Sequence, residues 1–425
     1  MIVVLFTGSY PYDDTPDRNF LDQEVKYLSA NFDRVIIVPG KCRGSRYPVQ
    51  AKVEIDESYG IALSKKGIIG RRLKNVFSHL VYEDIIARPS LLLLPYLLKR
   101  LMVFSNYVEI TQKWVCKFVE NERLDPAECV FYTFWLGVST LGIGLAKKCY
   151  PDICLISKAH GGDIYAERHR HAYIPCRPQS LAVLDGLFPD SDAGTRYISN
   201  RYPEYAHLCE TSRLGVADPG FITSPSKDGI FRIVSCSLLK NPLKRVDLLL
   251  KGIVQAARLR PELRIEWHHF GTGSLKPDIE SLAQENLPDS VSGFFPGYPS
   301  LEYLLLFYKN NPVDVFVNVS TTEGTPVAVM EAVSCGIPVV ATAVGGNTEI
   351  VSELNGELLN PDPTPDEIAK SILNIWDYPD LALEKRKQSR RIWQEKYDAD
   401  RNFQSFVDRL KSIRVRKLSI KKNSV

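Results

Sequence analysis

Two acidic residues lie eight positions apart in the segment EGTPVAVME, which runs from Glu323 to Glu331 and otherwise carries apolar or small side chains. The apolar run VFVNVS before them predicts a buried strand, and Pro326 suits the first position of a following helix. Eight residues of helix rise ~12 Å, so one carboxylate would lie on the turn before the helix and the other on the helix itself. The sequence therefore predicts two hydrogen-bond acceptors on either side of a helix N-terminus.

A helix N-terminus at the carboxyl end of a strand binds anions, above all phosphate, through free backbone amides. The amides concerned are those of Gly324, Thr325 and Val327. A ligand with hydroxyl groups at both ends and a diphosphate between them would satisfy this arrangement, and a nucleotide diphosphate sugar is such a ligand. The alternative is that both glutamates are the water-exposed ends of an ordinary helix, and the segment alone leaves both interpretations open.

The elements that must position these groups alternate between short β-branched runs and helical patterns, which is typical of parallel sheets with crossover helices. This pattern predicts an α/β fold. The predicted strands are Ile2–Thr7, Arg34–Pro39, Cys129–Phe134, Ile153–His160, Phe231–Ser237, Arg264–Gly271, Val313–Ser320 and Pro338–Thr342. The predicted helices are Asn19–Ala30, Leu136–Lys148, Arg245–Leu259, one from about Pro326, and an amphipathic region over Leu381–Leu410.

The chain is long enough for two domains, and the segment GVADPGFITSPSKDG between its halves is rich in turn-forming residues. We expect residues 1–215 to form a first doubly wound, Rossmann-like domain and residues 216–395 a second one. Residues 396–425 would form a C-terminal helix and basic tail that return to the first domain. Ligands of such sheets bind at the carboxyl ends of the strands, so a cleft between the two domains is the expected site.

The run VSTTEGTPVAVMEAVSCGIPVVATAVGGNTEIV resembles the signature of retaining GT-B glycosyltransferases of family 4, group 1. That family includes many bacterial surface-polysaccharide and lipopolysaccharide enzymes. Further pieces occur in the family's order over most of the chain: YPYDDTPDRNFLDQEV, YTFWL, KAHGGDIY, SLLKNPLKRVDLLL and HHFGTGSL. The resemblance implies a GT-B fold, in which the domain of residues 1–215 lies on the acceptor side and the domain of residues 216–395 binds the donor. It also implies that Glu323 holds donor-sugar hydroxyls near the reacting carbon and that Glu331 accepts hydrogen bonds from the ribose.

The resemblance also implies a basic pair that binds the diphosphate just after the first strand of the second domain. Lys244 matches the lysine of that pair, but Ser237 stands where the family usually has an arginine. Arg245 or Lys240 would then supply the missing charge. The alternative for Lys244 and Arg245 is a solvated pair at a helix start, which is unfavourable for the helix dipole.

His160 ends a predicted strand and is followed by two glycines that allow a ligand to approach the backbone closely. A single histidine is often structural, but the match at HGGD implies that His160 faces the donor sugar and that Asp163 lies close by. On the acceptor side we expect Gly8, in the loop before Arg18, and Trp135, whose ring suits either a sugar face or core packing.

Further motifs argue against a nicotinamide cofactor and against a metal ion. Gly271 and Gly273 in GTGSLK lack the third glycine of a dinucleotide fingerprint, so we expect them to border the nucleotide of the donor and expect no nicotinamide cofactor. The acids of the DSD segment at 190–192 are expected in a strand-end turn, so no metal is proposed. The nine cysteines show no paired spacing, which favours reduced thiols and a cytoplasmic protein.

The net charge of +3 does not indicate nucleic acid, but the positive charge is clustered in the segment ALSKKGIIGRRLKNVFSHLVY and in the C-terminal tail. This segment and the leucine-rich run after it, Lys65–Phe104, would suit either the inner face of an anionic membrane or two ordinary packed helices. The leucine-rich run falls short of the ~20 residues of a spanning helix.

These observations together predict a hexosyltransferase that moves a sugar from a nucleotide diphosphate sugar to a saccharide or lipid-linked saccharide, with retention of configuration and no cofactor. One alternative is a nucleotide-sugar epimerase of the same fold. The other is a non-catalytic sugar-nucleotide-binding partner of a polysaccharide assembly complex, an alternative that only Ser237 supports.

Overall fold

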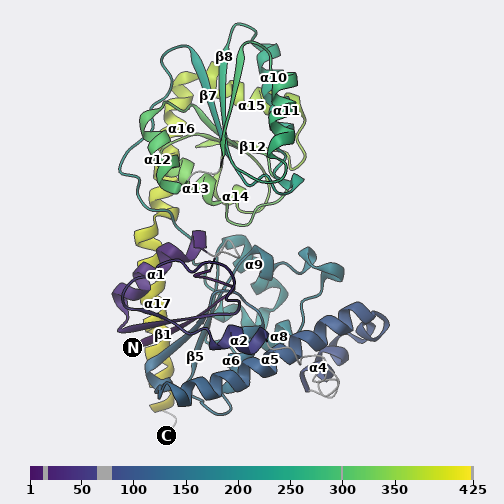
Figure 1. The fold of residues 1–425 in the computed structure, drawn as a ribbon, viewed down its shortest axis with the longest axis vertical. Helices are drawn as coiled ribbons and strands as arrows, with labels where there is room; N and C mark the ends of the chain where they lie inside the picture. Colours follow the sequence, from purple (N-terminus) through teal and green to yellow (C-terminus); the bar gives the residue numbers. More distant parts are fainter. Residues whose placement is uncertain (13–17, 65–78, 298–299, 423–425) are drawn as a thin grey trace. The chain divides into compact units, whose positions relative to one another are not determined.

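The computed structural model describes residues 1–12, 18–64, 79–297 and 300–422. The chain divides into two compact units. Unit 1 contains Met1–Arg213 together with Phe403–Val425, and unit 2 contains Leu214–Asn402. Each unit is built around its own parallel sheet with helices on both faces (Figure 1).

The described part of unit 1 contains a six-stranded sheet with the order β3-β2-β1-β4-β5-β6, in which every pairing is parallel. Its strands are β1 (Ile2–Thr7), β2 (Arg34–Pro39), β3 (Val53–Ile55), β4 (Cys129–Thr133), β5 (Cys154–Ala159) and β6 (Gly186–Pro189). Its helices are α1 (Arg18–Asn31), α2 (Ser58–Ser64), α4 (His79–Ala87), α5 (Pro95–Asn121), α6 (Val138–Ala146), α7 (Gly161–Ile164), α8 (Arg177–Ala182) and α9 (Asp192–Arg201). Short 3-10 turns lie at Pro89–Leu93, Pro126–Glu128, Ala166–Arg168, Arg170–Ala172 and Pro203–Leu208.

Alternate residues of β1 enter different cores because successive side chains of a strand point to opposite faces. Val4 and Phe6 pack in a core with α5 and α6, whereas Val3 and Leu5 pack in a second core with α1. The last helix of the chain, α17 (Ala399–Lys422), adds Phe406, Val407 and Leu410 to that second core. Unit 1 therefore completes its sheet packing with residues from both ends of the printed sequence.

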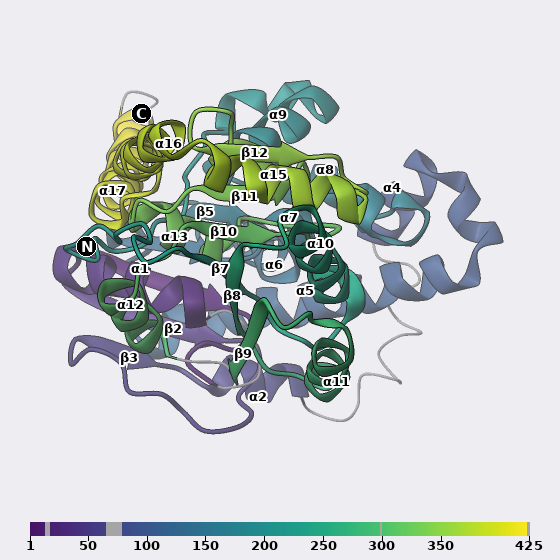
Figure 2. The same cartoon turned by 90° about the horizontal axis from the view of Figure 1, so that it is seen from above.

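The described part of unit 2 contains a second six-stranded parallel sheet with the order β12-β11-β10-β7-β8-β9, which can be followed across Figure 2. Its strands are β7 (Ile230–Cys236), β8 (Arg264–Phe270), β9 (Val291–Gly297), β10 (Val315–Asn318), β11 (Val339–Thr342) and β12 (Gly356–Leu359). Its helices are α10 (Val246–Leu259), α11 (Lys276–Asn286), α12 (Leu301–Asn310), α13 (Val327–Ser334), α14 (Asn347–Ile350), α15 (Pro365–Asp377) and α16 (Pro379–Ile392). A 3-10 turn at Pro242–Lys244 precedes α10, and a π turn at Trp393–Tyr397 follows α16.

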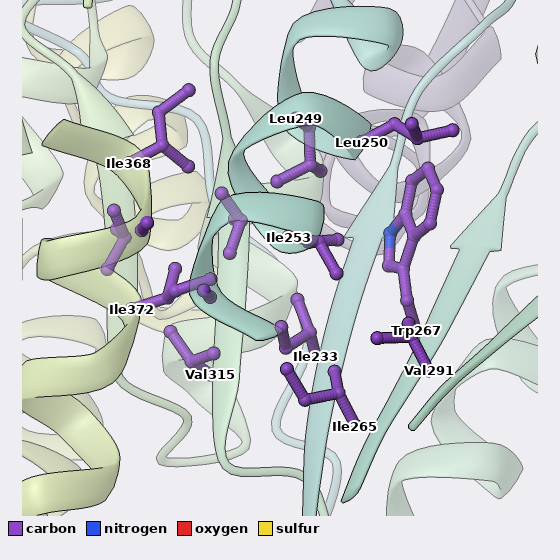
Figure 3. Close-up of a cluster of buried hydrophobic side chains, with 14 of the residues drawn as sticks. Ile233, Leu249, Leu250, Ile253, Ile265, Trp267, Val291, Val315, Ile368 and Ile372 are labelled. Atoms are coloured by element: carbon purple, nitrogen blue, oxygen red, sulfur yellow. The ribbon is translucent and has the colours of Figure 1, made fainter. Parts of the chain in front are cut away.

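One core of unit 2 lies between its sheet and the helices α10 and α15 (Figure 3). Leu249 and Ile253 of α10 and Ile368 of α15 are buried there with Trp267 of β8. Gly252 lets the two helices approach closely, since a Cβ at this position would lie 2.5 Å from Ile368. The sequence prediction of an α/β fold with two doubly wound sheets is confirmed.

Candidate active site

Both sheets reverse their strand order at one place, between β1 and β4 in unit 1 and between β7 and β10 in unit 2. Connections on the two sides of such a point leave the sheet in opposite directions, so a crevice opens beyond the carboxyl ends of the two strands. Most of the residues that the sequence predicts for the site follow these strands. Each unit is described separately below.

Glu323 lies in the loop after β10 and is only 8% exposed. Its Oε1 accepts hydrogen bonds from Lys244 Nζ at 2.6 Å and from Asn318 Nδ2 at 3.0 Å. Lys244 ends the 3-10 turn after β7, so the two strands at the reversal bring one cation and one carboxylate together. The Lys244 side chain is 27% exposed, which leaves its ammonium group accessible to an anionic ligand.

The loop that carries Glu323 is held by a glycine turn after β11. The amide of Gly346 donates to the carbonyl oxygen of Gly324 at 2.9 Å. A Cβ at Gly345 would lie 1.9 Å from the carbonyl oxygen of Glu323, and Gly345 has a φ of +48° that also favours glycine. The GG turn quoted from the sequence therefore acts as a backbone support for the acidic loop.

Glu331 lies on α13, and among the described residues no side chain or amide hydrogen-bonds its carboxyl group. Burial raises the pKa of Glu331 to about 8, because a charged carboxylate loses solvation there. At neutral pH the unliganded group is therefore largely protonated. It can exchange hydrogen bonds with a hydroxyl group of a ligand.

The start of α13 differs from the sequence prediction by one position. Pro326 precedes the helix, which begins at Val327, whereas the sequence predicts Pro326 as the first helical residue. Gly324 and Thr325 thus lie in the loop rather than in the helix. The hydroxyl group of Thr325 is buried and finds no hydrogen-bond partner among the described residues, so an unsatisfied donor remains beside Glu323.

Ser237 and Lys244 line one small recess together with Asn318 and Ser320, so the structure places Ser237 beside the Lys244–Glu323 pair. Arg245 follows a different course. Its guanidinium donates to the carbonyl oxygens of Val319 at 2.7 Å and Pro361 at 2.7 Å, and it forms an ion pair with Asp362 at 2.9 Å. These contacts tie together the loops after β10 and β12, and a role of Arg245 in phosphate binding stays a prediction.

Gly271 and Gly273 permit a close approach between the loops after β7 and β8. A Cβ at Gly271 would lie 2.0 Å from the carbonyl oxygen of Ser237, and one at Gly273 would lie 2.2 Å from that of Leu239. The structure thus gives a packing reason for both glycines. Residues 298–299 lie outside the described residues.

In unit 1, His160 follows β5 and is 7% exposed. Its Nδ1 lies 3.1 Å from Asp190 Oδ2, so the carboxylate fixes the proton on Nδ1, and Nε2 has no partner among the described residues. Burial alone would lower the pKa of His160, but the hydrogen bond and charge of Asp190 and the charge of Asp163 together raise it. The imidazole ring lies against those of Phe134 and Trp135, at centroid distances of 4.5 and 4.8 Å.

Asp163 joins the loop after β4 to the loop after β5. Its Oδ1 accepts from the amide of His160 at 2.6 Å and its Oδ2 from the amide of Leu136 at 2.7 Å. Burial raises the pKa of Asp163 to about 6 despite the nearby cations His160 and Arg177. The contacts indicate that Asp163 orients His160 and the neighbouring Trp135 rather than standing free.

Gly8 and Trp135 line the same pocket of unit 1, whose volume is about 760 Å³. Asp163 lies in a neighbouring recess of about 300 Å³, and Gly137 and Tyr107 line both. Residues 13–17 of the predicted acceptor loop lie outside the described residues. The structure thus brings the three predicted acceptor-side residues close to one another within unit 1.

Two polar residues of the site escape the sequence analysis. Asn318 ends β10 and hydrogen-bonds Glu323, and Asp190 directly follows β6 and fixes the orientation of His160. A polar side chain at the end of an apolar strand was the available signal in both cases, as in VFVNVS and GLFPD. The expectation for residues 190–192 was a strand-end turn; Ser191 indeed caps α9, while Asp190 turns to His160.

Within the described residues there is no group of three or more histidine, cysteine, aspartate or glutamate side chains arranged to hold a metal ion. In that same part of the chain, no helix has the length and apolar character needed to cross a membrane. The basic residues Lys65, Lys66, Arg71, Arg72 and Lys74 lie outside it.

Comparison with known proteins locates a family match in unit 2. Residues 231–377 match the family Glycosyl transferases group 1, a range that includes Lys244, Asn318, Glu323 and Glu331. The chain is also 29% identical over 138 residues to the UDP-N-acetylglucosamine–peptide N-acetylglucosaminyltransferase GtfA subunit of Streptococcus agalactiae. That alignment covers 32% of this chain and 25% of the relative. The chain spans less than half of the length of the curated relatives that it matches.

Solved structures extend the similarity to both units. The lipopolysaccharide outer core galactosyltransferase WaaB in its apo form is similar with a TM-score of 0.68 and 16% identity, over 97% of this chain and 99% of that protein. Anabaena HepE in complex with UDP and glucose is similar with a TM-score of 0.63 and 16% identity, over 97% and 100% of the two chains. The fold is that of GT-B glycosyltransferases.

Proposed function

We propose that this protein is a hexosyltransferase that moves a sugar from a nucleotide diphosphate sugar to a saccharide or lipid-linked saccharide, with retention of configuration. The observation that carries the proposal is the cluster of Lys244, Glu323 and Asn318 at the strand-order reversal of unit 2. This cluster lies inside the region that matches Glycosyl transferases group 1. The setting we propose is the cytoplasm, at the inner face of a membrane, in the assembly of surface polysaccharide such as lipopolysaccharide.

In this proposal the donor lies along the loop after β10 and the start of α13. Lys244 and the amides of Gly324, Thr325 and Val327 bind the diphosphate, and the Ser237 hydroxyl adds a hydrogen bond. Glu331 contacts the ribose hydroxyls. Glu323 holds hydroxyl groups of the transferred sugar, and Asn318 keeps its carboxylate in place.

The chemistry proposed is substitution on one face of the sugar. The bond from the anomeric carbon to the β-phosphate oxygen breaks, the acceptor oxygen forms its bond to the same face, and the acceptor proton passes to the departing diphosphate. Lys244 stabilises the negative charge of the leaving group, and Glu323 and His160 stabilise the positive charge that develops on the sugar. The proposal uses no cofactor and no metal ion.

The test begins with a thermal-shift screen of nucleotide diphosphate sugars, since a bound donor stabilises the folded protein. The Lys244→Gln variant is the control, because it should lose the shift. With the donor so identified, release of nucleoside diphosphate is measured with saccharide and lipid-linked acceptors, and the anomeric configuration of the product is read by NMR.

Each outcome separates the proposal from its alternatives. Acceptor-dependent release with retained configuration supports it. Conversion of the donor into a second sugar nucleotide in the absence of acceptor would identify an epimerase. Donor binding without release of nucleoside diphosphate, whichever acceptor is added, would identify a non-catalytic binding protein.

A further inference from the structure

The pocket of about 760 Å³ in unit 1 has a charge pattern that the proposed function does not use. It lies beyond the carboxyl ends of β1, β2 and β4, beside the strand-order reversal of that sheet. Two of the described residues that line it are cationic, Lys41 and Arg43, and none is acidic. A ligand of this pocket therefore meets positive charge, and no carboxylate in the described part of the wall compensates it.

Both cations are available to a ligand. Lys41 and Arg43 are exposed, and among the described residues neither side chain forms an ion pair or a hydrogen bond. Glu57, an acid whose charge adds to burial in raising the pKa of the neighbouring Cys42, is already engaged, because it accepts a hydrogen bond from Tyr12 and lies 3.8 Å from Arg46. Pairing among the described residues therefore does not neutralise the two cations.

The rest of the wall is largely apolar and aromatic. Tyr59, Tyr107 and Trp135 line it, together with aliphatic side chains from α2 and α6. Aromatic rings suit the apolar face of a sugar or polyol, whereas a cation pair binds an anionic substituent of the same molecule. Gly60 lets α2 lie close to the loop after β2, since a Cβ there would lie 2.7 Å from Cys42 Sγ.

We propose that this pocket selects an acceptor that carries an anionic group, a phosphate or a carboxylate, which Lys41 and Arg43 bind while the sugar or polyol ring lies on the aromatic wall. This inference rests on the proposed function, because only a transferase has an acceptor. The preference of the pocket for anions, by contrast, does not depend on turnover. It narrows the acceptor class from any saccharide to an acidic or phosphorylated one.

The experiment measures binding of three probes to the full-length protein without donor: glucose, glucose 6-phosphate and glucuronate. Titration by saturation-transfer NMR should show at least one anionic probe binding ten-fold or more tightly than glucose, and this preference should weaken as salt is raised. If glucose 6-phosphate alone binds more tightly than glucose, the anionic group of the acceptor is a phosphate. If both anionic probes bind more tightly, the pocket accepts either a phosphate or a carboxylate.

The Lys41→Gln/Arg43→Gln double variant should bind all three probes with equal affinity. The matched control is Lys117→Gln/Lys148→Gln, which removes two exposed cations of unit 1 that do not line the pocket and should keep the preference. Equal affinity of the three probes for the wild-type protein, binding of none of them, or a preference that survives in the double variant would overturn the inference.

The donor-free design separates this inference from the proposed function. If nucleotide sugars neither bind nor react but anion binding depends on Lys41 and Arg43, the proposed function fails and the anion site stands. If transfer occurs equally well to neutral and anionic acceptors, and the probes bind without preference, the function stands and this inference fails.

Discussion

Lys244 and Glu323 neutralise each other in the unliganded protein, and this pairing has a consequence for donor binding. A diphosphate beside Lys244 would compete for the same ammonium protons that Glu323 now accepts at 2.6 Å. Asn318 would still hold the carboxylate, and Glu323 would accept from sugar hydroxyls in place of Lys244. The pair thus keeps a buried acid compensated until a ligand brings its own negative charge.

Glu323→Gln tests this role at the residue scale. The amide keeps the size of the side chain but cannot stabilise positive charge on the sugar, so we expect turnover to fall by about 10²-fold or more. The affinity for the nucleoside diphosphate, measured by calorimetric titration, should change by less than about threefold because Lys244 remains. Glu262→Gln, at an exposed position of unit 2, is the control, and a fully active Glu323→Gln enzyme would remove Glu323 from the mechanism.

Glu331→Gln tests the protonation of the buried acid. The native pKa of about 8 lies above the ~4.3 of an unfolded glutamate, so the folded protein binds the extra proton. The protonated acid contributes its stability fully below pH ~4.3 and loses it as the pH rises through about 8. Melting temperatures measured from pH 5 to 8.5 should therefore fall more for the wild type than for Glu331→Gln. Parallel curves would contradict the shifted pKa, and Glu262→Gln should follow the wild type.

The residues that carry charge could be predicted from the sequence, but their partners could not. Lys244, Glu323 and His160 stand in recognisable segments. Asp190 matters because the parallel strands β5 and β6 bring their ends side by side, whereas Asn318 contacts Glu323 within one segment, five residues further along the chain. The strand order decides which ends are neighbours. A single sequence contains no direct record of that order.

At the scale of elements, the eight inner strands could be predicted from their apolar, β-branched runs, and the four edge strands could not. The edge strands are β3, β6, β9 and β12, of which β3 has only three residues and β6 and β9 contain both glycine and proline. An edge strand pairs on one side only, so it tolerates residues that would interrupt an inner strand. The inner strands alone were sufficient to place the site.

Gly345→Ala tests the contact between two loops. The added methyl group would collide with the carbonyl oxygen of Glu323 at a residue whose φ is +48°, so the loop after β10 must move. We expect a loss of about 1–3 kcal/mol in the stability of unit 2, seen as a lower melting temperature, together with weaker donor binding. Gly324→Ala is the matched control for stability, since its Cβ would meet no atom within 4 Å. Equal melting temperatures of the two variants would contradict the supporting role of the turn.

At the scale of the whole molecule, the residues of α17 are divided between the two units. The helix begins at Ala399 in unit 2 and continues in unit 1 from Phe403. Phe403 and Phe406 also face the buried Lys158, whose ammonium lies 4.4 Å from the centre of the Phe406 ring and pairs with Glu24. The helix therefore contributes apolar packing and a cation–π contact to unit 1. The amphipathic pattern of Leu381–Leu410 predicts a helix here, and residues 396–425 are expected to return to the first domain, but the pattern does not show which face of that domain's sheet the helix covers.

Phe406→Ala tests this contribution. Removing a fully buried ring should cost about 3–5 kcal/mol, and the loss should fall on unit 1 alone. Differential scanning calorimetry should show one transition moving to lower temperature while the transition that responds to added nucleotide keeps its position. Val415→Ala, on the same helix but 59% exposed, should leave both transitions in place. A uniform shift of both transitions by Phe406→Ala would contradict the assignment.

The return of α17 also sets an order of events during synthesis. Unit 2 is one continuous stretch, so all of its residues have been synthesised before Phe406, Val407 and Leu410 are made. The face of the unit 1 sheet that these residues cover must wait, although most of unit 1 is translated first. A chain truncated after residue 402 and released from the ribosome should therefore carry a protease-resistant unit 2 and an unprotected, chaperone-binding unit 1.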